Sequence, residues 1–129
     1  MAPFADAQPG DSLPTAKRTP DARELFFFEA ASWQPTPASD ASKANALPIP
    51  GELRAAWMSQ SITDWLGSRG TLAGFAWEDL TEARLGDTYE VHGSVAAVDP
   101  ASGEVTLDLR VESGAGVIVS TASARVRPA

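Results

Sequence analysis

The chain has 129 residues, of which 43% are hydrophobic, so it is long enough for one compact domain with a packed core. Its formal net charge is −7 and its 10 Lys and Arg residues are scattered, so nucleic acid is not an expected partner. The chain has no cysteine and a single histidine, His92. This excludes disulfides, thiolate metal sites, a cysteine nucleophile and any metal site of several histidines within one chain, and we expect no metal and no cofactor.

The sequence also bears on location. No apolar run approaches the ~20 residues that a membrane-spanning helix needs. The first ten residues, MAPFADAQPG, lack the basic and apolar regions of a secretory signal. We therefore expect a cytoplasmic protein that does not enter a membrane.

The first part of the chain is rich in proline. Residues 1–20 hold Pro3, Pro9, Pro14 and Pro20 among small and acidic residues. Such a composition buries too little apolar area to offset the entropy cost of ordering, so we expect a disordered N-terminal arm over 1–20 and a single domain over 21–129.

Two short elements are predicted at the beginning of that domain. Residues 23–29 (RELFFFE) form an apolar and aromatic run between charges, which favours a buried strand. Residues 32–50 hold four prolines and are expected to be irregular. Within them, residues 40–44 could form one helical turn with Asp40 as its N-cap.

The clearest element is a helix from Gly51 to Gly67. Glu52 in its first turn favours the helix dipole, and Gly67 is a natural stop. At 100° per residue the apolar side chains fall on two nearly opposite faces. The first face holds Ala55, Met58, Ile62, Trp65 and Leu66, and the second holds Leu53, Ala56 and Trp57. A helix that is apolar on two sides is expected to be buried.

Four strands are predicted after the helix, over residues 71–77, 88–98, 105–112 and 117–126. The third alternates most regularly between apolar and polar residues, which is typical of a strand with one face in water. Turn residues separate the last three strands. This order predicts an α+β fold in which an antiparallel sheet curls around one long helix.

This order of elements, together with several local motifs, resembles the hot-dog superfamily and, within it, the MaoC-like hydratases and dehydratases. The helix ending in TDWLG and the LGDT turn at residues 85–88 are similar to the family's central helix and to the turn that opens its next strand. The resemblance covers residues 50–128. It implies a hot-dog fold and an acyl thioester as ligand, carried on coenzyme A or on an acyl carrier protein.

The catalytic motif of the family departs from its usual pattern in this chain. MaoC-like hydratases carry G-D-x-N-P-x-H before the helix, and its Asp and His act on water or on a substrate proton. When the motif is aligned on Asp40, those positions hold Trp33 and Ala38. The resemblance therefore implies the scaffold without the usual acid and base.

Candidate binding residues lie at the start of the helix. Unpaired N–H groups around Gly51 and Leu53 could polarise a thioester carbonyl, as in an oxyanion hole. Glycine at position 51 would let a ligand approach the backbone. Trp57 and Trp33 are candidates to line an acyl pocket, although large aromatic residues are equally suited to a core or an interface.

Three residues are candidates for acid–base catalysis. Asp40 and Glu52 are the carboxylates nearest the helix start in the sequence, but capping and dipole compensation are ordinary roles for them. His92 is predicted to lie within a strand and to face away from Tyr89 and Val91, toward solvent or a partner subunit, where a structural role is the simpler interpretation.

Three hypotheses follow. The first is a non-catalytic hot-dog subunit that binds an acyl thioester and forms a homodimer, or a heterodimer with another hot-dog protein that is active. The second is an active dehydratase, cyclase or thioesterase that uses Asp40, Glu52 or His92. The third is a binding module that does not contact thioesters, because one fold can serve many functions.

Overall fold

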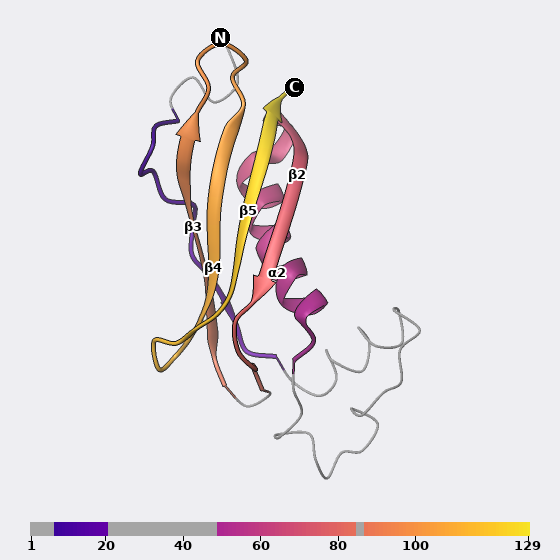
Figure 1. Ribbon diagram of the computed structural model, residues 1–129, viewed down its shortest axis with the longest axis vertical. Helices are drawn as coiled ribbons and strands as arrows, with labels where there is room; N and C mark the ends of the chain where they lie inside the picture. Colours follow the sequence, from indigo (N-terminus) through magenta and orange to yellow (C-terminus); the bar gives the residue numbers. More distant parts are fainter. Residues whose placement is uncertain (1–6, 21–48, 85–86) are drawn as a thin grey trace.

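The computed structural model describes residues 7–20, 49–84 and 87–129. These residues form a five-stranded antiparallel sheet, in the order β1-β3-β4-β5-β2, with a single long helix against one face (Figure 1). The elements in chain order are β1 (Ala16–Arg18), α2 (Gly51–Leu66), η3 (Gly67–Arg69), β2 (Gly70–Asp79), β3 (Tyr89–Val98), β4 (Val105–Ser113) and β5 (Ile118–Pro128).

The predicted helix and the four strands after it are confirmed, each within three residues of the expected bounds. The alternation in β4 predicted its orientation correctly, because Val105, Leu107, Leu109 and Val111 are all buried on the side of α2. The two short connections, β3–β4 and β4–β5, join strands that are neighbours in the sheet. The α+β class and the single curled sheet follow the sequence prediction.

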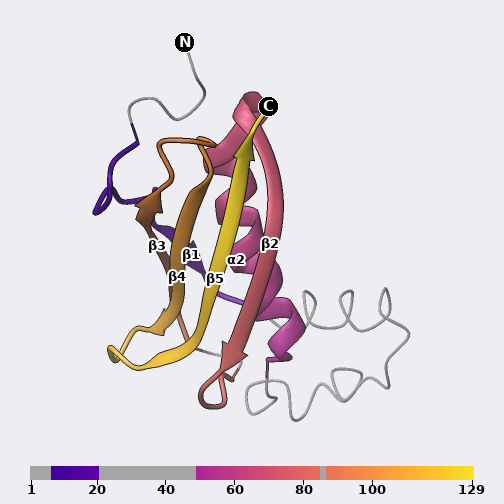
Figure 2. The same ribbon diagram turned by 45° about the horizontal axis from the view of Figure 1, so that its top comes forward.

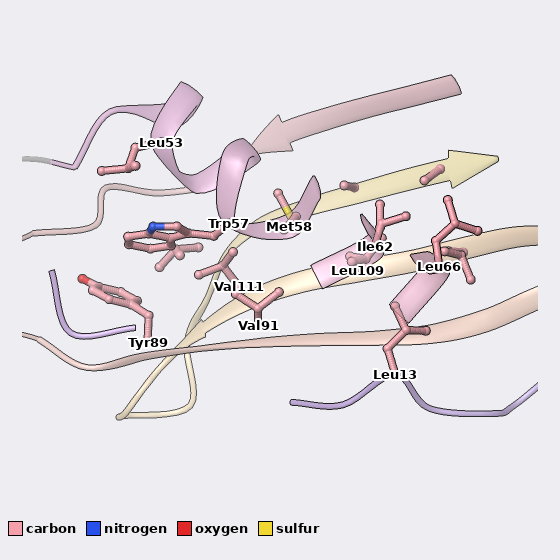
Figure 3. Packing of buried hydrophobic residues seen from close by; sticks show 14 of the residues in the cluster. Leu13, Leu53, Trp57, Met58, Ile62, Leu66, Tyr89, Val91, Leu109 and Val111 are labelled. Carbon is pink, nitrogen blue, oxygen red and sulfur yellow. The ribbon is translucent and has the colours of Figure 1, made fainter. Parts of the chain in front are cut away.

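The core lies between α2 and the sheet. Met58 and Ile62 are fully buried on the helix, and Trp57 is 2% exposed. The Trp57 ring lies over that of Tyr89, with ring centroids 6.0 Å apart and planes tilted by 34° (Figure 3). Aromatic pairs in this distance range contribute beyond the area that they bury.

One part of the helix prediction is wrong. Of the three residues expected on the second buried face, Leu53 and Trp57 are buried as expected, but Ala56 is exposed, as are Glu52 and Gln60. In the described part of the chain the sheet covers α2 from one side only, as the two views of the ribbon show (Figures 1 and 2). The side of α2 that faces away from the sheet therefore keeps a polar stripe.

The N-terminal segment differs from the disordered arm expected over 1–20. Ala16–Arg18 form the edge strand β1, which pairs with β3. Before it, the amide of Gly10 donates to the carbonyl of Val95 at 2.8 Å, and the Leu13 side chain is only 4% exposed against the core. Composition alone did not predict this order, because the hydrogen bonds of the segment come from β3, which is distant in the sequence. Without the segment, β3 would present an unpaired edge.

Proline is compatible with this arrangement, because an edge segment has one side that does not need N–H donors.

The predicted strand over 23–29 and the helical turn over 40–44 lie outside the described residues. Within the described ranges, no helix is long and apolar enough to cross a membrane.

Candidate functional site

The start of α2 has no capping side chain. Pro50 occupies the N-cap position, with φ −57° and ψ 144°, and its side chain makes no capping hydrogen bond. Its carbonyl accepts the amides of Leu53 and Arg54 at 3.1 and 3.2 Å. The Leu53 amide, expected to be unpaired, therefore has a partner. The amides of Gly51 and Glu52 have none within the helix, so this end still carries partial positive charge and hydrogen-bond donors.

A carboxylate from the sheet lies against this helix end. Asp79 is the last residue of β2 and is paired in register with Ser120 of β5. The Ser120 hydroxyl donates a hydrogen bond to Asp79 Oδ1 at 2.8 Å. A Cβ atom built on Gly51 would lie 1.9 Å from Asp79 Oδ2, so only glycine leaves room for the carboxylate in this position. Both ribbon views place the end of β2 beside the first turn of α2 (Figures 1 and 2).

A buried arginine completes this cluster. Arg54 is 6% exposed and its Nη2 lies 3.7 Å from Asp79 Oδ1. Its Nη1 donates to the carbonyls of Thr81 and Val119, at 2.7 and 3.2 Å. Burying a guanidinium costs free energy unless hydrogen bonds and a counter-charge compensate, and this arrangement supplies them at Nη1 and Nη2. Nε is buried and has no hydrogen-bond partner among the described residues. We call Arg54, Asp79 and Ser120 the β2-end cluster.

The loop after β2 runs beside the residues that lead into α2. The amide of Ile49 donates to the carbonyl of Ala83 at 2.6 Å. The Tyr89 hydroxyl accepts the Arg84 amide at 2.9 Å and donates to the Arg84 carbonyl at 3.1 Å. Burial raises the pKa of Tyr89, so the hydroxyl stays protonated and keeps the loop in place.

The predicted binding residues lie at different depths. Gly51 is partly buried at the helix start, next to the β2-end cluster, whereas the Glu52 side chain is exposed. Leu53 is 7% exposed and Trp57 is 2% exposed, and both belong to the hydrophobic core. Trp33 and Asp40 lie outside the described residues, so their roles stay predictions.

His92 lies on the other face of the sheet, as expected from its alternation with Tyr89 and Val91. Its Nε2 is 3.6 Å from Glu90 Oε2 and 3.5 Å from Glu112 Oε2. Its Nδ1 is 3.4 Å from the Thr15 hydroxyl, which belongs to the N-terminal segment. The sheet therefore separates His92 from the helix start, and the structure does not bring the two together.

Sequence reasoning missed the β2-end cluster. One signal was present: Arg54 precedes Met58 by four residues, so it falls on the stripe of α2 that faces the sheet. A charged residue on a buried stripe needs a partner of opposite charge. The sequence could not identify that partner, because Asp79 follows 25 residues later in the chain. Among the described residues, no group of three or more His, Cys, Asp or Glu side chains could hold a metal ion.

Comparison with known proteins supports the fold. No protein-family model and no curated protein sequence matches the chain. Among solved structures, the R-hydratase PhaJ1 from Pseudomonas aeruginosa has a TM-score of 0.86 at 24% identity, over 98% of this chain and 84% of that one. The (R)-hydratase from A. caviae involved in PHA biosynthesis has a TM-score of 0.83 at 20% identity, over 97% and 99%.

The ChsH1-ChsH2 complex from Mycobacterium tuberculosis is a third similar structure. It has a TM-score of 0.80 at 20% identity, over 95% of this chain and 98% of that one. The chain therefore has the hot-dog fold. Its structural neighbours are MaoC-like hydratases and other hot-dog proteins, as the sequence motifs predicted.

Proposed function

We propose that this chain binds an acyl thioester, carried on coenzyme A or on an acyl carrier protein, at the start of α2. The observation that carries the proposal is the start of α2 at Gly51, which no side chain caps by a hydrogen bond and where backbone N–H groups lie beside the Asp79 carboxylate. The N–H donors at this end suit the carbonyl oxygen of a thioester, and suit still better the negative charge that develops there during reaction. The resemblance to MaoC-like hydratases implies the same class of ligand, and two of the similar structures are (R)-hydratases.

A matched pair of ligands tests this proposal. Butyryl-coenzyme A and S-butyl-coenzyme A differ chiefly in the carbonyl, and thermal unfolding with each ligand gives its affinity. A ligand at 100 times its Kd stabilises the native state by about 2.7 kcal/mol. We expect the thioester to bind roughly tenfold more tightly than the thioether, equivalent to about 1.4 kcal/mol. Equal affinities would contradict the role of the carbonyl, and no binding of either ligand would favour a module that does not contact thioesters.

We further propose that the chain acts together with a second hot-dog protomer, either another copy or a different protein. β2 is the outermost strand of the described sheet and is ten residues long. Trp77 is 45% exposed on it and Leu80, just after it, is 51% exposed. A long edge strand with exposed apolar side chains favours pairing with another strand. The ChsH1-ChsH2 complex is a hot-dog neighbour formed by two different proteins.

Sedimentation of the purified chain tests the pairing. We expect a dimer for the wild type and a shift toward monomer for Trp77→Asp. Ala115→Asp in the exposed turn between β4 and β5 is the control and should leave the dimer intact. If the chain alone is monomeric, co-expression with other hot-dog proteins decides between a heteromeric partner and no partner.

Two versions of the function differ in catalysis. The non-catalytic version rests on Trp33 and Ala38, which stand where the hydratase motif has its acid and base. The active version is favoured by a specific observation, the carboxylate of Asp79 beside the helix start. Hydration of enoyl thioesters by the chain alone would contradict the non-catalytic version.

A further inference from the structure

We propose that Asp79 is the acid–base residue of this site and that Ser120 and Arg54 position it. This assignment rests on the proposed acyl-thioester function and names the residue for its active version. It replaces the roles expected of Glu52 and His92.

The two oxygens of the Asp79 carboxylate have different surroundings. Oδ1 accepts the Ser120 hydroxyl at 2.8 Å and lies 3.7 Å from Arg54 Nη2. Oδ2 lies on the Gly51 side, and no described residue donates a hydrogen bond to it. One oxygen is therefore held while the other has free lone pairs. This arrangement is typical of a base whose orientation is fixed by a neighbouring group.

The carboxylate is both anchored and accessible. The Asp79 side chain is 35% exposed, whereas Ser120 is fully buried and the Arg54 side chain is 7% exposed. The anchoring groups thus lie beneath the carboxylate, and solvent or a ligand reaches it from the other side. Because Gly51 has no Cβ, the carboxylate lies directly against the helix start, where a ligand held by the helix N–H groups would also be within its reach.

The alternative residues are placed less well. Glu52 has an exposed side chain on the polar stripe of α2, away from the sheet. His92 lies on the opposite face of the sheet, between Glu90 and Glu112. Of the predicted and observed acids and bases in the described chain, Asp79 is the one that the fold brings against Gly51.

The step assigned to Asp79 is the addition of water to an enoyl thioester. Asp79 Oδ2 takes a proton from water while the water oxygen bonds to C3 of the substrate. The electron pair of the C2=C3 bond moves toward the thioester oxygen, where helix N–H groups stabilise the negative charge. The protonated Asp79 then gives its proton to C2, so that one water has been added and the carboxylate is restored. Dehydration follows the same path in reverse.

Steady-state hydration of short, medium and long trans-2-enoyl-coenzyme A thioesters tests this assignment, with thermal unfolding as the measure of binding. We expect Asp79→Asn to lower kcat by roughly 100-fold or more, the range typical of a lost general base, while the thioester still stabilises the protein. Asp79→Glu should restore part of the activity. Asp108→Asn removes an exposed carboxylate on the other face of the sheet and should behave as the wild type.

Two further variants separate catalysis from folding. Ser120→Ala should lower kcat by roughly tenfold, about 1.4 kcal/mol, with little change in KM, since the base remains but is less well oriented. Gly51→Ala should lower kcat because its Cβ displaces the carboxylate. These two variants carry the test if Asp79→Asn does not fold.

The outcomes distinguish this assignment from the proposed function. If thioesters fail to stabilise the wild type, the proposed function fails and the assignment falls with it. If they stabilise the wild type but it does not hydrate any of them, or if Asp79→Asn keeps full activity, only the assignment of Asp79 is overturned. Release of free thiol in place of hydration would likewise overturn the addition step.

Discussion

The buried guanidinium of Arg54 gives the most direct test of the β2-end cluster as a structural unit. We consider Arg54→Met, which keeps an unbranched side chain of similar length and removes the charge and the donors. In the folded protein this change removes the Arg54 donor from the carbonyl of Thr81 and leaves Asp79 without its counter-charge. The carbonyl of Val119 also loses Arg54, but it still accepts the Leu80 amide at 2.9 Å.

The magnitude follows from these contacts. Hydrogen bonds that involve a charged group contribute about 1.5–3 kcal/mol each, and the 2.7 Å bond to Thr81 is the better of the two. The ion pair adds less than about 1 kcal/mol, because Asp79 is 35% exposed and 3.7 Å away, so solvent screens it. Relief of the desolvation of a buried cation offsets part of the loss. We expect a net loss of about 3 kcal/mol.

Chemical denaturation followed by tryptophan fluorescence measures this loss, and thermal unfolding should show a Tm lower by roughly 10 °C. Arg110→Met is the matched control, since Arg110 is 46% exposed on the outer face of the sheet and pairs only loosely with Glu112 at 3.6 Å. A double-mutant cycle with Asp79→Asn isolates the ion pair. If Arg54→Met lowers the free energy of unfolding no more than Arg110→Met does, the hydrogen bonds of the buried guanidinium do not stabilise the fold.

Three further predictions concern the core, the N-terminal segment and pH. Ile62→Ala should destabilise the protein by about 2–5 kcal/mol in a denaturant titration, because Ile62 is fully buried, whereas Val117→Ala, at a residue 50% exposed, should change stability by less than about 1 kcal/mol. Leu13→Ala should lower the free energy of unfolding by about 2–3 kcal/mol and speed proteolysis before β1, since Leu13 is 4% exposed. If it destabilises the protein no more than Val117→Ala does, the N-terminal segment does not add to the core. Burial raises the pKa of Tyr89, so the unfolded state loses this proton first as pH rises. The stability that Tyr89 contributes is therefore complete below its unfolded pKa, near 10, and is lost as pH rises further. The Tm of the wild type should fall more steeply above about pH 10 than that of Tyr89→Phe, and parallel curves would contradict the inference.

Much of the fold could be predicted because its signals are local. The alternation of Val105, Leu107, Leu109 and Val111 fixes which face of β4 is buried, and the helix from Gly51 carries its own start and stop residues. The face of His92 followed from the same alternation. These features depend on neighbours within a few residues, so the order of the chain is enough to predict them.

The candidate site was predicted only in part. The start of α2 was identified from Pro50 and Gly51, but its acid was sought at Glu52, Asp40 and His92. Glu52 is close to the site in sequence but points away from the sheet, because an adjacent helical position is rotated by about 100°. Asp79 reaches the site only because β2 pairs with β5 in the register that places it beside Ser120.

Local patterns in the sequence predict α2, the four strands after it and their order, the buried faces of β3 and β4, and the resemblance to the hot-dog superfamily, because periodicity and turn residues act over short distances. Two further features come from the tertiary structure. It showed that the proline-rich segment before residue 20 completes the sheet along β3, and it brought Arg54, Asp79 and Gly51 together at one end of the core. Both features depend on the register between strands that are far apart in the chain. Many weak contacts together determine this register, so no short sequence motif predicts it.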